Sequence, residues 1–150
     1  MKRQKELGVH TMQLSEFISN HAKDVYVYGG VDDNIVNEAE TRLAVAMPNS
    51  LRDYLTKYGA LECRYLEFFG LGFSGSSYLN LITRTLELRE DGLPNGYIVF
   101  QDLGDMHYAV CDTDGSVYEW APAQGDAIFK ELGADFEEYV VTTMQQSLSL

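Results

Sequence analysis

The chain has 150 residues, enough for one domain with a sizeable core, and 45% of them are hydrophobic, which excludes a disordered protein. It carries 23 acidic residues against 11 lysines and arginines, a formal net charge of -12. This charge repels phosphate backbones and argues against nucleic acid as a direct ligand. It favours a basic protein partner, although solubility alone would also account for it.

Targeting signals are not evident in the sequence. The opening stretch "MKRQKELGVH" has the positive charges of a signal peptide but no apolar run behind them. No segment approaches the ~18 apolar residues of a membrane span, so we expect a cytoplasmic protein with no membrane partner. Cys63 and Cys111 are expected to be buried free thiols, and a disulfide between them stays open.

The first predicted element in chain order is a short amphipathic helix over about residues 11–23, with Thr11 as its cap. "VYVYGG" at 25–30 then alternates valine and tyrosine up to two glycines, which predicts a strand or an extended linker. A second helix follows, and we expect Ile35 on the stripe that faces the core.

"MPNSLRDYLTKYG" at 47–59 is the clearest helix signal in the chain. Pro48 suits the first helical turn, where its missing N–H costs nothing, and Gly59 supplies a residue that can end the helix with positive φ. "LECR" and "YLEFF", at 61–64 and 65–69, then predict a pair of strands.

A glycine-rich stretch, "FFGLGFSGSS", comes next and reads G-x-G-x-x-G through Gly70, Gly72 and Gly75. A dinucleotide site also needs a parallel strand–helix–strand unit and an acidic residue about 20 positions later, at the end of its second strand. At that distance Glu90 and Asp91 lie at the end of a helix, before any second strand. We therefore interpret the glycines as a structural turn.

The remaining chain predicts a helix over about 78–89, three short strands over 97–120 and a last helix. The three strands are joined so closely that they must form an antiparallel meander. Asp135 and Glu138 form a capping box at the start of the last helix, and the final residues, 147–150, are expected to fray.

No catalytic or metal site is predicted. "DTDGS" at 112–116 begins like a calcium loop, but Val117 and Ala123 stand where that loop needs glycine and glutamate. His107 and Cys111 share a strand face but are separated by ~13 Å of strand rise, too far for a hydrogen bond. We expect no catalytic residues, no cofactor and no metal.

Aromatic and acidic side chains on the predicted strands and turns are the candidates for a binding surface. If one sheet face is uncovered, these residues would make a partner interface; the alternative is that helices cover that face and the rings belong to the core. The candidate interface residues are Tyr65, Glu67, Asp102, Asp105, Glu119 and Trp120.

One extended motif resembles a known family. The pattern E-x-x-L-x-x-x-MP-x-SL-x-x-YL-x-x-YG runs from Glu40 to Gly59. Gly70 after an aromatic strand, then "DTDGSVY" and a C-terminal helix, follow in the same order. This order resembles the SUKH superfamily, also called the Smi/Knr family, over about residues 30–145. Met47 stands where the family usually has leucine, a swap that should matter little.

The resemblance implies an α+β fold in which helices pack on a mostly antiparallel, strongly twisted sheet of about five or six strands, with a C-terminal helix. We therefore expect one SUKH-like domain over residues 1–150, with its core over about 30–145. The resemblance also implies a binding protein without catalysis. The matched motif residues are expected to be structural, and residues that face a partner cannot be transferred from the family.

Bacterial members of this superfamily are largely immunity proteins, or antitoxins, for secreted polymorphic toxins, many of them nucleases; fungal members are cell-wall regulators. The resemblance thus implies an antitoxin whose partner is a cognate LXG-type toxin with a basic nuclease domain. The alternative is a non-catalytic scaffold or regulatory module that binds a phosphate or sugar at the glycine loop. Whether the chain forms a homo-oligomer stays open.

Overall fold

The computed structural model describes residues 12–124 and 130–149, and within these ranges helices and strands are mixed along the chain. The helices are α1 (Leu14–Asn20), α2 (Asp33–Leu43), α3 (Asn49–Tyr58), α4 (Leu81–Glu90) and α5 (Phe136–Leu148). The strands are β1 (Val25–Val27), β2 (Leu61–Cys63), β3 (Leu66–Phe68), β4 (Ile98–Gly104), β5 (His107–Cys111), β6 (Val117–Trp120) and β7 (Lys130–Gly133). The predicted α+β class with a C-terminal helix is confirmed.

The strands form two antiparallel sheets, β1-β2-β3 and β4-β5-β6-β7, where a single sheet was expected. The N–H of Phe69, just beyond β3, donates to the carbonyl of Phe100 in β4 at 2.8 Å, so the two sheets meet at this point. The β4–β5 register shifts between Val99 and Gln101 and again before Gly104. Such irregularities bend and twist a strand, which turns β4 away from β3.

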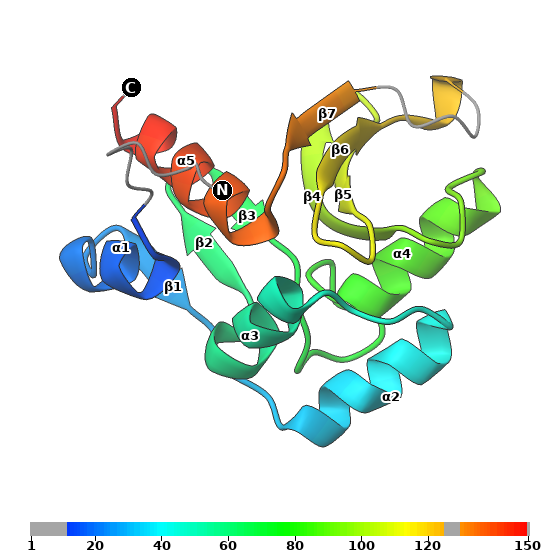
Figure 1. Cartoon of the computed structure of the whole chain (residues 1–150), viewed down its shortest axis with the longest axis horizontal. Helices are drawn as coiled ribbons and strands as arrows, with labels where there is room; N and C mark the ends of the chain where they lie inside the picture. The colour runs from blue at the N-terminus through cyan, green and yellow to red at the C-terminus, as the bar shows by residue number, and fades with distance from the viewer. Residues whose placement is uncertain (1–11, 125–129, 150) are drawn as a thin grey trace, which may run out of the picture.

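Helices cover the inner sides of both sheets (Figure 1). α5 lies over the three-stranded sheet, where the hydroxyl of Ser147 is 3.7 Å from the sulfur of Cys63. α4 packs on β4, where the buried hydroxyl of Thr85 accepts the N–H of Val99 at 3.1 Å. The core therefore continues from one sheet to the other beneath α4 and α5.

Residues of the Glu40-to-Gly59 motif hold α3 against the meeting point of the sheets. The buried hydroxyl of Tyr54 donates to the carbonyls of Phe68 and Phe69, at 3.1 and 2.9 Å. Gly59 and Gly70 approach so closely that a Cβ on Gly70 would lie 1.5 Å from the carbonyl oxygen of Gly59. Glycine at position 70 is therefore required by contact between backbones, although its own φ is not positive.

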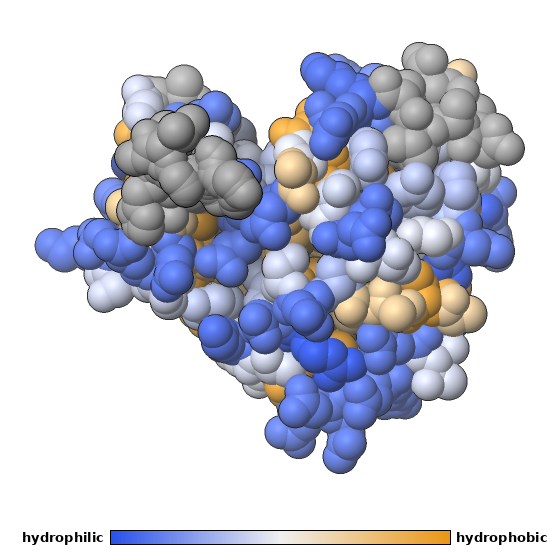
Figure 2. All heavy atoms as spheres, in the orientation of Figure 1, coloured by the Kyte–Doolittle hydropathy of each residue, from blue (hydrophilic) through white to orange (hydrophobic). Residues whose placement is uncertain are grey.

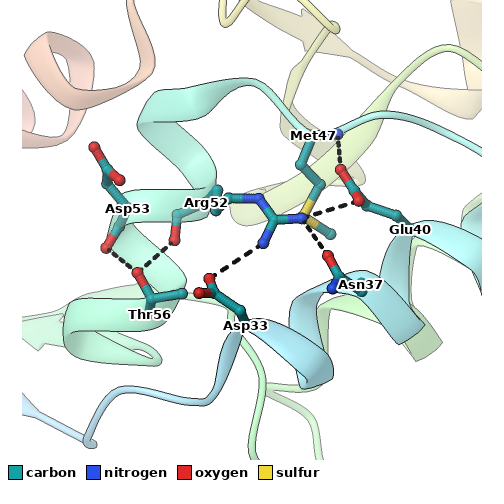
Figure 3. A network of polar contacts seen from close by, with 7 residues as sticks. All are labelled: Asp33, Asn37, Glu40, Met47, Arg52, Asp53 and Thr56. Atoms are coloured by element: carbon teal, nitrogen blue, oxygen red, sulfur yellow. Dashed lines mark hydrogen bonds and ion pairs between the residues drawn. The ribbon is translucent and has the colours of Figure 1, made fainter.

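Arg52 of α3 binds three side chains of α2 and so fixes the angle between the two helices (Figure 3). Its guanidinium donates to Asp33, Asn37 and Glu40 at 3.3, 2.8 and 3.0 Å. Glu40 also accepts the N–H of Met47 at 2.8 Å, which holds the loop between the helices. The first residue of the motif thus has a structural role.

Two predictions about the helices are wrong, one about the start of α3 and one about the buried face of α2. Pro48 is the N-cap of α3, with extended backbone (φ -64°, ψ 152°), and its carbonyl accepts the N–H of Arg52. Ile35 is 40% exposed, because the core-facing stripe of α2 is centred on Val36 and Ala39. Each helical residue is rotated by about 100° from the one before it, which carries Ile35 out of contact with the core.

The helix ends also differ from the predictions. α1 begins at Leu14 with Gln13 as its N-cap, and the expected cap, Thr11, lies outside the described residues. α5 continues to Leu148, and Ser147 is only 3% exposed, so fraying is wrong for these two positions. β7 was not predicted, because its sequence "KELG" is short, polar and without alternation.

Candidate functional site

Among residues 12–124 and 130–149, no helix covers the outward face of the three-stranded sheet, where Tyr26 is 60% exposed. Tyr26 of β1 lies opposite Glu62 of β2, and Glu62 lies opposite Glu67 of β3. These three side chains point away from α5, because the alternate residues of the strands, such as Cys63, are buried beneath it. We call the surface formed by Tyr26, Glu62 and Glu67 the outer face.

A groove of about 460 Å³ continues the outer face between β3, the end of β4 and α5. Figure 2 shows the surface notched beside the four-stranded sheet, on a side of the molecule that is mainly hydrophilic. The groove, called the acidic groove below, is lined among others by Tyr65, Glu67, Tyr78, Asp102, Leu103 and Tyr139.

Asp102 is fixed in the acidic groove by two hydrogen bonds. Its Oδ1 accepts the N–H of Gly104 at 2.8 Å, and its Oδ2 accepts the hydroxyl of Tyr78 at 3.3 Å. Burial and the negative charge of Asp102 raise the pKa of Tyr78 to about 12. The Tyr78 hydroxyl is therefore protonated at neutral pH and donates the hydrogen bond that holds the Asp102 carboxylate in place.

The carboxylates of this surface repel one another. Partial burial and the charges of Glu62 and Asp102 raise the pKa of Glu67 above its ordinary value of 4.5. The hydroxyl of Tyr28 donates to Glu62, and chiefly this bond raises the pKa of Tyr28 to about 12. Among the described residues, neither Lys nor Arg forms an ion pair with these three carboxylates, so their charge is available to a partner.

Aromatic rings surround the carboxylates. Tyr26 and Tyr28 meet edge to face with centroids 4.7 Å apart, and Tyr28 meets Phe73 at 5.3 Å. Phe73 belongs to the glycine-rich stretch, which thus lies beside the outer face. The guanidinium of Arg84 lies 5.3 Å from the ring centroid of Tyr78. Tyrosines placed in this way are typical of protein interfaces.

The structure brings three of the six predicted interface residues together. Tyr65, which is 69% exposed, Glu67 and Asp102 all line the acidic groove. Asp105 is exposed at the tip of the β4–β5 hairpin, next to this groove. Glu119 lies on β6, outside the lining of the acidic groove, and its carboxylate already has partners within the protein, His107 at 2.5 Å and Lys130 at 3.9 Å.

Trp120 is a correction, because it is completely buried and cannot contact a partner. It lies opposite Tyr108 in the β5–β6 pair, and its ring reaches beneath Gly92 after α4. Alternation along its strand assigns the indole to one face of the sheet, but it does not tell whether that face is covered. The turn that covers this face comes from a segment nearly thirty positions earlier, which local sequence does not reveal.

Several residues of this surface were not predicted as candidates. Glu62 stands between the buried Leu61 and Cys63, and Tyr26 follows the buried Val25; this alternation is the signal that could have identified the outer face. Tyr139 of α5 packs its ring against the core, and its hydroxyl donates to Gln101 at the wall of the groove, at 2.8 Å. Leu103, at the end of β4, carries no local signal.

The glycine-rich stretch cannot hold a phosphate in the way a dinucleotide loop does. The side chain of Asn80 already accepts the N–H groups of Ile82 and Thr83, the donors that a phosphate at the start of α4 would use. The N–H of Gly70 is likewise bonded to the carbonyl of Leu79. The interpretation of the glycines as a structural turn agrees with this geometry.

The other sequence motifs also form local structure. Asp112 accepts the N–H groups of Asp114 and Ser116, and Gly115 has φ +89°, so "DTDGS" is a hairpin turn. Cys63 and Cys111 are free and buried. Within residues 12–124 and 130–149, no cluster of His, Cys, Asp or Glu is arranged to hold a metal. No helix in that part of the chain has the length and apolar character needed to cross a membrane.

Comparison with known proteins agrees with this architecture. The crystal structure of a protein from Pseudomonas syringae pv. tomato superposes with a TM-score of 0.62, covering 73% of this chain and 84% of that chain. The two sequences are 19% identical, so this likeness concerns the fold alone. The sequence model of the SUKH_5 family, described as SMI1-KNR4 cell-wall, matches residues 13–145. The chain therefore belongs to the SUKH_5 family of the SUKH superfamily.

Proposed function

We propose that this protein is an antitoxin that binds a cognate secreted toxin of the LXG type and blocks its basic nuclease domain. Membership of the SUKH superfamily is consistent with an immunity role. That the partner is an LXG-type toxin and that its active domain is a nuclease are the finer parts of the proposal. We further propose that the protein acts in the cytoplasm, by binding and without catalysis.

The acidic groove, together with the outer face that it continues, is the observation that carries this proposal. Glu62, Glu67 and Asp102 present negative charge that Lys and Arg side chains do not neutralise within the described chain. Tyr65 and Tyr78 add exposed aromatic surface beside them. A nuclease must present cations to bind phosphates, and such a surface complements these carboxylates.

The net charge of -12 supports the same partner class. A nucleic acid would be repelled, whereas a basic protein would be drawn in from a distance. Fast capture matters for an antitoxin, because each toxin molecule that stays unbound continues to act. A role in binding phosphates or sugars at the glycine loop is not proposed, because Asn80 occupies the donors of α4.

Co-expression tests the proposal. Cells that produce the toxin domain encoded beside this gene should stop growing, and co-expression of this protein should restore growth and give a complex that co-purifies. A variant with Glu67→Lys and Asp102→Lys should rescue less well, whereas Glu38→Lys, an exposed reversal on α2, should rescue like the wild type. Absence of both rescue and complex would refute the antitoxin role.

A further inference from the structure

The tip of the β4–β5 hairpin has a conformation that its sequence does not favour. Gly104 pairs with His107, which leaves Asp105 and Met106 as a two-residue loop. Both loop residues have positive φ, at 54° and 65°. This is the pattern of a type I′ turn, which favours aspartate or asparagine followed by glycine. Asp105 fits the first position, and Met106 stands where glycine would be free of strain.

Exposure makes the choice of methionine more unusual. Met106 is 61% exposed and Leu103 is 37% exposed, so two apolar side chains project from one tip into solvent. Neither burial nor turn geometry explains methionine at this position. A side chain that costs stability and fills no core indicates a role outside the folding of this chain.

The tip is held rigidly at the end of the acidic groove. Asp102 binds both the Gly104 N–H and the Tyr78 hydroxyl, and this fixes the strand end that carries Leu103. Leu103 and Gly104 line the groove together with Glu67. A partner that covers the carboxylates of the groove must therefore also meet the tip. A rigid apolar tip loses little conformational freedom when it binds.

We propose that Leu103 and Met106 form an apolar anchor that enters a pocket on the same basic toxin domain, with the pocket rimmed by the cations that meet the acidic groove. This inference rests on the proposed function and adds the part of the surface that slows dissociation. Charge at the groove sets how fast the partner arrives, and the buried anchor sets how long it stays. The flexible thioether of methionine suits a pocket of irregular shape.

The test uses Met106→Gly, which gives the favoured Asp-Gly turn. The variant should melt about 2–4 °C above the wild type, because the strain is relieved. It should also dissociate about tenfold or more faster from the inactivated toxin domain that passes the rescue test above. Stability and binding would then change in opposite directions, which general damage to the fold cannot produce.

Two further variants separate the side chain from the backbone. Met106→Asn also tolerates positive φ and should dissociate as fast as Met106→Gly, which would exclude the flexibility of glycine as the cause. Leu103→Ala should likewise dissociate faster. Ile35→Ala, a comparably exposed apolar residue on α2, is the matched control and should dissociate like the wild type.

The outcomes distinguish the two proposals. If the wild type neither rescues cells nor binds the toxin domain, the proposed function and the anchor both fail. If the wild type binds but Met106→Gly and Leu103→Ala dissociate at the wild-type rate, the anchor is wrong and the antitoxin role stands. A melting temperature that falls in Met106→Gly would overturn the strain argument without any partner.

Discussion

Glu67 lies directly opposite Glu62 across the β2–β3 pair, so two negative charges face each other on the outer face. Like charges directly opposite in a sheet destabilise it by about 0.2–1 kcal/mol. We expect Glu67→Gln to raise the free energy of unfolding at pH 7 by about this amount, measured by urea denaturation. Glu38→Gln, on the exposed side of α2, is the control and should leave it unchanged.

The pH dependence of this difference follows from the raised pKa of Glu67. Because the folded pKa lies above the ordinary value of 4.5, the charged form destabilises the fold above the folded pKa. That penalty shrinks as the pH falls through the folded pKa toward 4.5, and it disappears below 4.5, where the carboxyl is protonated in both states. The stability difference between wild type and Glu67→Gln should therefore shrink between pH 7 and 4.5. A difference that grows in this range would contradict the pKa direction.

Gly70→Ala should be among the most destabilising single changes in the chain. A Cβ at this position would lie 1.5 Å from the carbonyl oxygen of Gly59, so the backbones must separate. We expect a loss of about 3 kcal/mol or more, seen as a lower thermal midpoint or as insoluble protein. Gly96→Ala is the matched control, because a Cβ there meets nothing within 4 Å, and its midpoint should stay within about 2 °C of the wild type.

Much of the fold could be predicted because the relevant signals are local. The closely spaced strands after residue 97 correctly indicated the antiparallel meander, and alternation in "VYVY" indicated a strand or an extended linker where the structure has β1. The division into two sheets could not be predicted, since it depends on irregularities in β4 and on the contact between Phe69 and Phe100. The Phe69–Phe100 contact joins residues about thirty positions apart in the sequence.

The candidate site was predictable only in part, for a similar reason. Alternation places Glu67 and Trp120 on defined faces of their strands, but only the helices and turns decide which face is covered. The outer face stays open, so Glu67 is exposed, whereas the turn after α4 covers Trp120. The backbone strain at Met106 could not be predicted either, because the register of the β4–β5 hairpin decides that Met106 is a loop residue with positive φ.

Tyr54→Phe tests the link between α3 and the meeting point of the sheets. The variant keeps the buried ring but removes the hydroxyl that donates to the carbonyls of Phe68 and Phe69. We expect a loss of about 1–3 kcal/mol in the free energy of unfolding, because buried carbonyls lose a donor. Tyr65→Phe removes an exposed hydroxyl and should cost less than about 0.5 kcal/mol. Equal effects in the two variants would argue against a structural role for Tyr54.

Charge reversal in the acidic groove, at Glu67, and next to it, at Asp105, tests how the partner arrives. Glu67→Lys and Asp105→Lys should each lower the association rate constant for the inactivated toxin domain, because long-range attraction speeds encounter. Rising salt should slow the wild type by about tenfold or more, since surface charges are screened beyond about 8–10 Å near physiological ionic strength. The dissociation rate should change less than it does in Met106→Gly, and Glu38→Lys should associate faster than either groove variant. An association rate that does not depend on salt would mean that charge does not guide the encounter. An association rate that Glu38→Lys lowers as much as the groove variants do would mean that net charge alone guides it. Either result would remove the role of the acidic groove in capture.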